Sequence, residues 1–270
     1  MEEPKQILTP EEVSRLAVMA EAELANEYLY QILEVGQTML QCGGEVSRVE
    51  ESIRRMCLAF GAERADVFTI TSSIVVTVYA HKFGTLTQTR RIAGMKYDLN
   101  RLELLNQLCR LICSEHPSPE EMHEALEQIM AVPQYGFGIQ LVTYALISSS
   151  FSLFFGGSVL DAAASGVIGI LLKYLERMIQ GVDAGPLLPA MLCSCLGGLL
   201  AGLAVRFGLG DSVDMISIGN IMLLIPGVAL TNSLRDMFSG NTISGLMRFI
   251  EAILLALTIA CGFALAASLV

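Results

Sequence analysis

Charge is scarce in this sequence and unevenly distributed. Charged residues make up 16% of the 270 residues, whereas soluble globular proteins carry about 25%. Residues 1–133 hold 12 Lys and Arg and 20 Asp and Glu, but residues 134–270 hold only 5 and 7. Tryptophan is absent, and hydrophobic residues make up 53% of the chain. This composition excludes a single soluble domain, a disordered polymer or a small disulfide-stapled module as a description of the whole chain.

Basic clusters, a signal peptide and catalytic motifs are also missing. The net charge of −10 and the lack of a Lys/Arg-rich run argue against nucleic acid as a partner. An acidic N-terminus does not fit a cleaved signal peptide. Seven cysteines scattered over both halves favour reduced, buried thiols. Because no phosphate-binding loop, nucleophile elbow or metal-ligand motif is found, we expect no catalytic residue, no metal, no cofactor and no enzymatic activity.

Long uncharged runs fill the second half of the chain. A helix needs about 20 apolar residues to cross the hydrocarbon core of a bilayer. The uncharged runs cover residues 128–160, 162–172, 184–205, 215–234 and 252–270. They predict an all-α membrane domain over residues 134–270, with spans at about 135–156, 158–176, 186–206, 214–232 and 249–269. A soluble helical core is disfavoured, because its helices rarely run this long without a charge.

Lysine and arginine in the connecting loops predict the orientation. Four of them lie in or beside the loops on one side of the predicted spans, whereas Arg206 is alone on the other; the four are Lys173, Arg177, Arg235 and Arg248. Cytoplasmic loops carry the excess of basic residues. We therefore expect a cytoplasmic N-terminus, and an odd number of spans then places the C-terminus outside.

The first half has the pattern of a cytosolic α+β domain, residues 1–133. Apolar residues recur at helical spacing or alternate as in strands, with β-branched residues in the latter. The expected helices cover residues 10–34, 36–60, 99–112 and 120–130, and the expected strands cover 68–79 and 85–92. The predicted fold class is an α+β cytosolic N-terminal domain followed by an all-α polytopic membrane domain of about five transmembrane helices.

One polar motif lies in the first half. Gly43 and Gly44 interrupt a helical pattern and predict a bend or a close backbone approach, because glycine is costly inside a helix. Arg48 and Glu50 follow within two turns. Two interpretations are open: a ligand-binding turn, or a helix break with a solvated charged face.

The region from Asn220 to Glu251 has the most chemical content. Pro226 and Gly227 predict a kinked or partly unwound helix, because proline removes a backbone donor. Polar groups follow this point or lie elsewhere at predicted membrane depth. The candidates for substrate binding or coupling are Asp161, Asn220, Pro226, Gly227, Thr231, Asn232, Arg235, Asp236, Arg248 and Glu251. Ionisable groups at membrane depth are by default functional candidates; the alternative is that some are loop residues that set orientation.

Three motifs follow one another along nearly the whole chain: Gly43-Gly44-x-x-x-Arg48-Val49-Glu50 with the Phe68–Tyr79 segment, Phe155-Gly156-Gly157-x-x-x-Asp161, and Pro226-Gly227-x-x-Leu230-Thr231-Asn232-x-x-x-Asp236-x-x-x-Gly240-x-x-x-x-Gly245-x-x-Arg248. Their order and their placement on the predicted spans resemble the threonine/serine exporter family. The resemblance implies a multi-pass secondary transporter in the bacterial inner membrane that exports small amino acids, or a dicarboxylate such as succinate. It also implies a second membrane subunit, because this chain resembles the N-terminal half of the longer members; a homo-oligomer is the other possibility.

Alternating access driven by an ion gradient, most simply of protons, is the expected mechanism, because no nucleotide-binding motif is found. A titratable carboxylate must then change its exposure, and the candidates in order are Asp161, Asp236 and Glu251. The competing hypothesis is a membrane-anchored cytosolic enzyme or metabolite sensor that acts through residues 1–133. Five spans exceed what an anchor needs, which favours transport.

Overall fold

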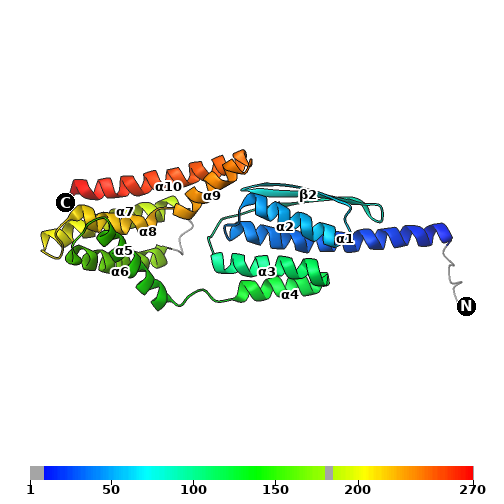
Figure 1. Ribbon diagram of the computed structural model, residues 1–270, viewed down its shortest axis with the longest axis horizontal. Helices are drawn as coiled ribbons and strands as arrows, with labels where there is room; N and C mark the ends of the chain where they lie inside the picture. Colours follow the sequence, from blue (N-terminus) through cyan, green and yellow to red (C-terminus); the bar gives the residue numbers. More distant parts are fainter. Residues whose placement is uncertain (1–8, 180–184, 270) are drawn as a thin grey trace, which may run out of the picture. The chain divides into compact units, whose positions relative to one another are not determined.

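The computed structural model describes residues 9–179 and 185–269 (Figure 1). Helices dominate these ranges, with one small sheet among them. The elements are α1 (Pro10–Gln41), α2 (Val46–Ala59), β1 (Arg64–Ile70), β2 (Ser73–Ala80), β3 (Gly84–Arg91), α3 (Leu99–Glu115), α4 (Pro119–Ala131), α5 (Phe137–Phe154), α6 (Val159–Ile179), α7 (Leu187–Arg206), α8 (Val213–Leu224), α9 (Gly227–Phe238) and α10 (Thr242–Leu269).

Two compact units share the chain, and they do not follow its order. The sheet unit contains the residues up to Val132 together with residues 232–247, and the helical unit contains residues 133–231 and the residues from Arg248 onward. Helix α9 therefore passes into the sheet unit after Thr231, and α10 leaves it after Met247. Residues 232–247 are called the docked segment below.

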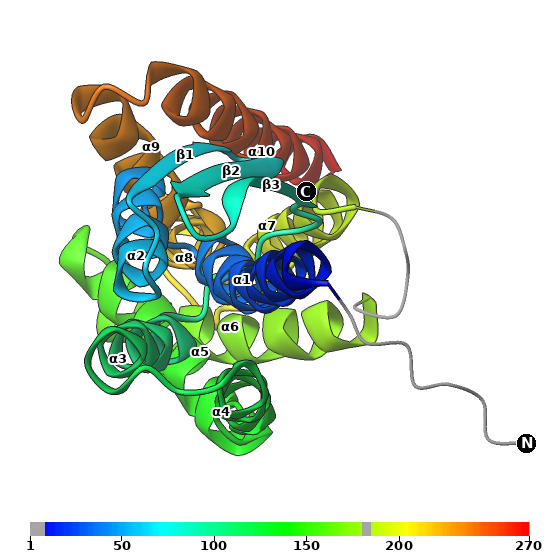
Figure 2. The same ribbon diagram turned by 90° about the vertical axis from the view of Figure 1, so that its right-hand side faces the viewer.

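Three layers build most of the sheet unit (Figures 1 and 2). The antiparallel sheet has the order β1-β2-β3, α1 and α2 cover one of its faces, and α3 and α4 pack on the far side of these two helices. Alternate residues of β2 face the core, and Ile74, Val76 and Val78 are all buried. A two-residue period of this kind buries one face of a sheet.

Helix α1 is longer than the periodicity predicts. The sequence predicts separate helices over 10–34 and 36–60, whereas α1 continues through Gly36 to Gln41 and α2 begins at Val46. Gly36 stays helical because Ile53 of α2 packs against its backbone, where a Cβ atom would clash. The break falls instead at Gly43, whose φ of +96° suits glycine.

The predicted strand over residues 68–79 is in fact two strands. The chain turns at Thr71 and Ser72, and Ile70 pairs with Ser73 across the end of the hairpin. The glycine or asparagine that usually marks a two-residue hairpin turn is absent at these positions. The local sequence therefore gives no warning of the turn. The predicted helices over 99–112 and 120–130 correspond to α3 and α4 and are confirmed.

Small residues set the packing of the helical unit. A Cβ atom added at Gly219 of α8 would lie 2.6 Å from the Ser148 carbonyl oxygen of α5, and one at Gly198 of α7 would lie 2.6 Å from the Ala266 Cβ of α10. Helices in apolar surroundings associate through such close backbone contacts. The backbones of α5 and α8, and of α7 and α10, accordingly approach each other closely.

The predicted fold class is wrong. The sheet is small and shares its compact unit with the docked segment from far along the chain, so no distinct cytosolic N-terminal domain is present. Among the described residues three helices are long and apolar enough to cross a membrane, namely α5, α7 and α10, and the number rises to four if the bent pair α8–α9 is one span. The predicted number of five is not reached because α6 carries Asp161 near its start and Lys173, Glu176 and Arg177 near its end.

The break predicted at Pro226 is confirmed. Helix α8 ends at Leu224, α9 begins at Gly227, and the two helices are bent by 55°. Pro226 has no N–H to donate to the carbonyl of the preceding turn, so the helix cannot continue unbroken. The bend directs the chain from the helical unit into the docked segment.

Candidate functional site

The predicted site residues fall into two groups, one in each unit. The sheet unit contains the α1–α2 turn with its motif residues and three residues of the docked segment: Gly43, Gly44, Arg48, Glu50, Asn232, Arg235 and Asp236. The helical unit contains the remainder: Asp161, Asn220, Pro226, Gly227, Thr231, Arg248 and Glu251. The two groups are described separately.

Helix α9 binds to the turn between α1 and α2. The Asn232 Nδ2 donates to the Gly43 carbonyl oxygen at 3.2 Å, and the Val46 amide donates to Asp236 Oδ1 at 3.3 Å. Arg235, between these two residues, forms an ion pair with Glu45. Three consecutive polar positions of the docked segment thus contact one short turn.

The glycines of that turn permit a close approach, as predicted. At Gly43 an added Cβ would strike the Tyr97 ring, and at Gly44 it would lie 2.9 Å from the Met39 carbonyl oxygen. Arg48 is largely exposed and lies 3.4 Å from the same Glu45 carboxylate that Arg235 contacts. Glu45 therefore lies between two guanidinium groups. The turn has both features that the sequence left as alternatives, because it breaks the helix and also binds a polar segment.

Glu50 connects α2 to the docked segment through strand β1. Its Oε1 accepts the Thr69 amide at 2.7 Å, and the Thr69 carbonyl oxygen accepts the Ser244 hydroxyl of α10 at 3.3 Å. Burial raises the pKa of the Glu50 carboxyl, and the Asp236 charge acts in the same direction, while the amide and hydroxyl of Thr69 and the Arg54 charge oppose both. The net direction is upward, so Glu50 holds its proton to a higher pH than an exposed glutamate.

A buried polar cluster joins three helices of the helical unit. The Ser148 hydroxyl of α5 lies 2.7 Å from the Ser165 hydroxyl of α6 and donates to Asn220 Oδ1 of α8 at 2.8 Å. Asn220 Nδ2 donates to the Ile216 carbonyl oxygen at 2.9 Å. All three cluster residues, Ser148, Ser165 and Asn220, are buried. Hydroxyl and amide groups that satisfy one another in this way hold neighbouring helices together in apolar surroundings.

Asp161 has a well-defined set of partners. Its Oδ1 accepts the backbone amides of Asp211 at 2.7 Å and Ser212 at 2.9 Å, and its Oδ2 accepts the Ser158 amide at 3.0 Å. The Ser158 hydroxyl in turn accepts the Asp161 amide at 3.1 Å, which completes a reciprocal cap at the start of α6. The carboxylate therefore fixes the α7–α8 connection to α6.

The other predicted residues of the helical unit have different surroundings. The Thr231 hydroxyl is exposed and donates to the Gly227 carbonyl oxygen at 2.9 Å, within α9. Arg248 is buried, with 2% of its surface exposed, whereas Glu251 is exposed. The pair that their spacing suggests is therefore divided between a buried and an exposed position.

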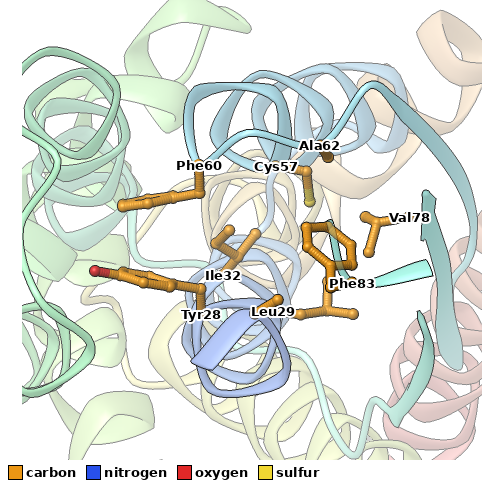
Figure 3. Close-up of a pocket in the computed structure, with 9 residues that line it drawn as sticks. Tyr28, Leu29, Ile32, Cys57, Phe60, Ala62, Val78 and Phe83 are labelled. Atoms are coloured by element: carbon orange, nitrogen blue, oxygen red, sulfur yellow. The ribbon is translucent and has the colours of Figure 1, made fainter. Parts of the chain in front are cut away.

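A small hollow in the sheet unit is apolar (Figure 3). About 20 Å³ in volume, it lies between α1, α2 and the sheet, where Tyr28 stacks on Phe60 with the ring centroids 4.1 Å apart. Burial raises the pKa of the Cys57 thiol in its wall to about 12, which keeps the thiol protonated at neutral pH. The hollow provides neither room nor polar groups for a metabolite. Among the described residues, no group of three His, Cys, Asp or Glu is placed to hold a metal ion.

The thiols are free throughout the described residues. Cys42, Cys57, Cys109 and Cys193 are buried, as predicted, whereas Cys261 is exposed. Burial also raises the pKa of Cys109 to about 12. These thiols are packing groups and not nucleophiles.

Residues of the buried polar cluster escaped the sequence analysis. Ser148 and Ser152 lie four positions apart on α5, and both are buried. Hydroxyls repeated at this interval within an uncharged helix are a signal that could have found them, since positions i and i+4 share one helix face. Lys173 is a second omission. Its ammonium lies 2.9 Å from the Glu176 carboxylate and above the Tyr144 ring, which compensates a buried charge.

Comparison with known proteins gives a consistent set of relatives. The model of the threonine/serine exporter family ThrE matches residues 31–270. A "Threonine/serine exporter" of Corynebacterium glutamicum is 22% identical over 246 residues, which cover 86% of this chain and 49% of that protein. A "Probable succinate transporter subunit YjjP" of Klebsiella aerogenes is 23% identical over 84% of this chain and 88% of its own length. The protein of that name from Escherichia coli is also 23% identical, over 87% and 91%. No solved structure matches the chain.

Proposed function

Because the chain belongs to the threonine/serine exporter family, we propose that it is an integral membrane subunit of a secondary active exporter that moves small polar metabolites out of the cytoplasm by alternating access. The observation that carries this proposal is the 55° bend between α8 and α9. Many secondary transporters place substrate and ion sites at discontinuous helices. The bend lies directly before Asn232, Arg235 and Asp236, the polar residues of the docked segment.

A carboxylate is the chemical group that the candidate substrates share. Relatives are named for threonine and serine on the one hand and for succinate on the other, and all three molecules carry a carboxylate. Arg235 offers the guanidinium that suits such a group, and Asn232 offers an amide donor. Arg235 is paired with Glu45 in this structure. We propose that a substrate carboxylate competes with Glu45 for this guanidinium.

Protons are the proposed coupling ion. Asp161, Asp236 and Glu251 remain the candidates within or beside the apolar helices. Asp161 holds three backbone amides, Asp236 is fully buried on α9, and Glu251 is exposed on α10. Because a coupling carboxylate must take up and release a proton as its exposure changes, we propose that buried Asp236 takes part in coupling beside Asp161.

A second membrane subunit is the proposed partner. The chain spans about half the length of the Corynebacterium relative but nearly the whole length of the relatives named as transporter subunits. We propose that the other half of the transporter is a separate chain; a homo-oligomer is the alternative. We further propose that the complex lies in the bacterial inner membrane with the N-terminus of this chain in the cytoplasm and its C-terminus outside.

The competing function is an anchored enzyme or metabolite sensor acting through residues 1–133. The apolar hollow of Figure 3 and its protonated thiol give this hypothesis no reactive group. Transport rather than catalysis is therefore the proposed activity.

Export should require both subunits. Cells that lack their own exporters are preloaded with labelled threonine, serine or succinate, and efflux is measured with this chain alone, the second subunit alone, and both together. We expect efflux of at least one substrate only with both, and its loss when a protonophore collapses the gradient. Absence of efflux from all cells, although both proteins are inserted, would contradict the proposed function and favour the sensor hypothesis.

Asn232→Ala should weaken substrate binding. The substitution removes an amide donor of the docked segment, and a lost hydrogen bond of about 1.4 kcal/mol corresponds to a tenfold rise in apparent KM. Efflux kinetics at several internal substrate concentrations measure this change. Ser239→Ala, at an exposed position of the same segment, is the matched control. An unaltered KM for Asn232→Ala would remove Asn232 from the binding site.

Asp161→Asn should abolish export while the protein still inserts into the membrane. Asparagine keeps one acceptor oxygen but turns the other group into a donor, which faces an amide that also donates. Efflux and the amount of protein in the membrane fraction are compared with those of Asp214→Asn, which changes an exposed carboxylate on α8. Wild-type export by Asp161→Asn would exclude Asp161 from the mechanism. Loss of export with a lowered Tm in detergent would assign the carboxylate to capping and not to coupling.

A further inference from the structure

Two carboxylates lie along the flank of α2 that faces the docked segment. Asp236 is fully buried and accepts the amide of Val46, the first residue of α2. Glu50 lies one helical turn after Val46, is partly buried, and is within electrostatic reach of Asp236. Like charges placed together in a poorly solvated site disfavour double ionisation.

We propose that Glu50 and Asp236 form a proton-binding pair, and that the proton they share controls how tightly the sheet unit holds the docked segment. This inference rests on the proposed function, because it assigns a proton site to an exporter driven by protons. It adds Glu50, a residue outside the apolar helices, to the coupling machinery.

The charges around the pair leave it incompletely neutralised. On α2, Arg54 is the cation that favours ionised Glu50, but it is about half exposed and lies 3.7 Å from Glu51. On β1, Thr69 offers Glu50 only neutral donors. On α9, Arg235 pairs with Glu45. Since the nearest cations are shared with other carboxylates, a proton is the remaining means of relieving the repulsion.

A hydrogen-bonded path leads from Glu50 to both ends of the docked segment. Through the Thr69 peptide, Glu50 is linked to Ser244 at the start of α10. Through the Val46 amide, α2 is linked to Asp236 on α9. A hydrogen bond to an ionised carboxylate is roughly twice as strong as one between neutral groups. Protonation of Glu50 therefore weakens its bond to Thr69, and protonation of Asp236 weakens its bond to α2.

Proton binding to the pair fixes the sign of a pH effect on stability. Because the folded state raises the pKa of Glu50 above its unfolded value, the folded protein gains stability from the proton below the raised pKa. That gain is lost as the pH rises through it. Glu50→Gln should remove this component of the pH dependence.

The test measures Tm of the purified full chain in detergent at a series of pH values above the ordinary pKa of glutamate. Wild-type protein should lose Tm as the pH rises, and Glu50→Gln should flatten this slope. Asp236→Asn removes the like charge, so the proton affinity of Glu50 should fall about tenfold and the slope should move down by about one pH unit. Glu51→Gln is the matched control on α2, because Glu51 is exposed and paired with Arg55 at 2.7 Å; its profile should equal the wild-type profile.

Infrared difference spectra provide a second readout that does not depend on stability. A band from a protonated carboxyl group should be present near neutral pH in the wild type, be absent in Glu50→Gln and persist in Glu51→Gln. A midpoint that is the same in wild type and Asp236→Asn would overturn the pair. The same conclusion would follow if the carboxyl band survived in Glu50→Gln.

Efflux against an imposed pH gradient separates this inference from the proposed function. If the wild-type complex exports and the pair is correct, Glu50→Gln should transport with a flattened pH profile while Glu51→Gln keeps the normal one. If the wild-type complex exports nothing, the proposed function fails, and the stability and infrared titrations still decide whether the pair binds a proton.

Discussion

The contact on which the rest of the structure depends is the binding of α9 to the turn between α1 and α2. Asp236 and Val46 are 190 residues apart in the chain, yet they are joined by a hydrogen bond. The buried carboxylate satisfies an amide at the start of a helix, where the first four amides lack partners within the helix. This bond, the Asn232 contact with Gly43 and the Arg235 ion pair with Glu45 include residues 232–247 in the sheet unit.

Docking of this segment explains how a region rich in charge is tied to one that has little. Two helices, α9 and α10, run without interruption from one unit to the other, and both carry polar contacts to the sheet unit at the end that lies within it. The bend at Pro226 precedes the segment directly. A change in its grip acts on helices that enter the apolar region, which is the kind of bistable element that alternating access needs.

Local chemistry predicted part of this arrangement. Gly43 and Pro226 disclosed the two chain breaks, because a positive φ and a missing N–H are properties of single residues. The hairpin turn at Thr71 carries no such mark, and the number of spans was overestimated because α6 combines an apolar centre with charged ends. The partners of Asp161, Asp236 and Glu50 are set by tertiary contacts over long separations. One sequence taken alone holds no record of these pairings, so polar residues could be nominated but not assigned to one another.

The central claim, that residues 232–247 are held by the sheet unit, is tested most directly by hydrogen exchange of the full chain in detergent. Amides of a cooperative unit lose protection together when its core is weakened. Ile74→Ala weakens the core of the sheet unit, and Leu172→Ala weakens that of the helical unit, since both side chains are buried. The account predicts faster exchange in residues 232–247 for Ile74→Ala and wild-type exchange there for Leu172→Ala. The reverse result would contradict it.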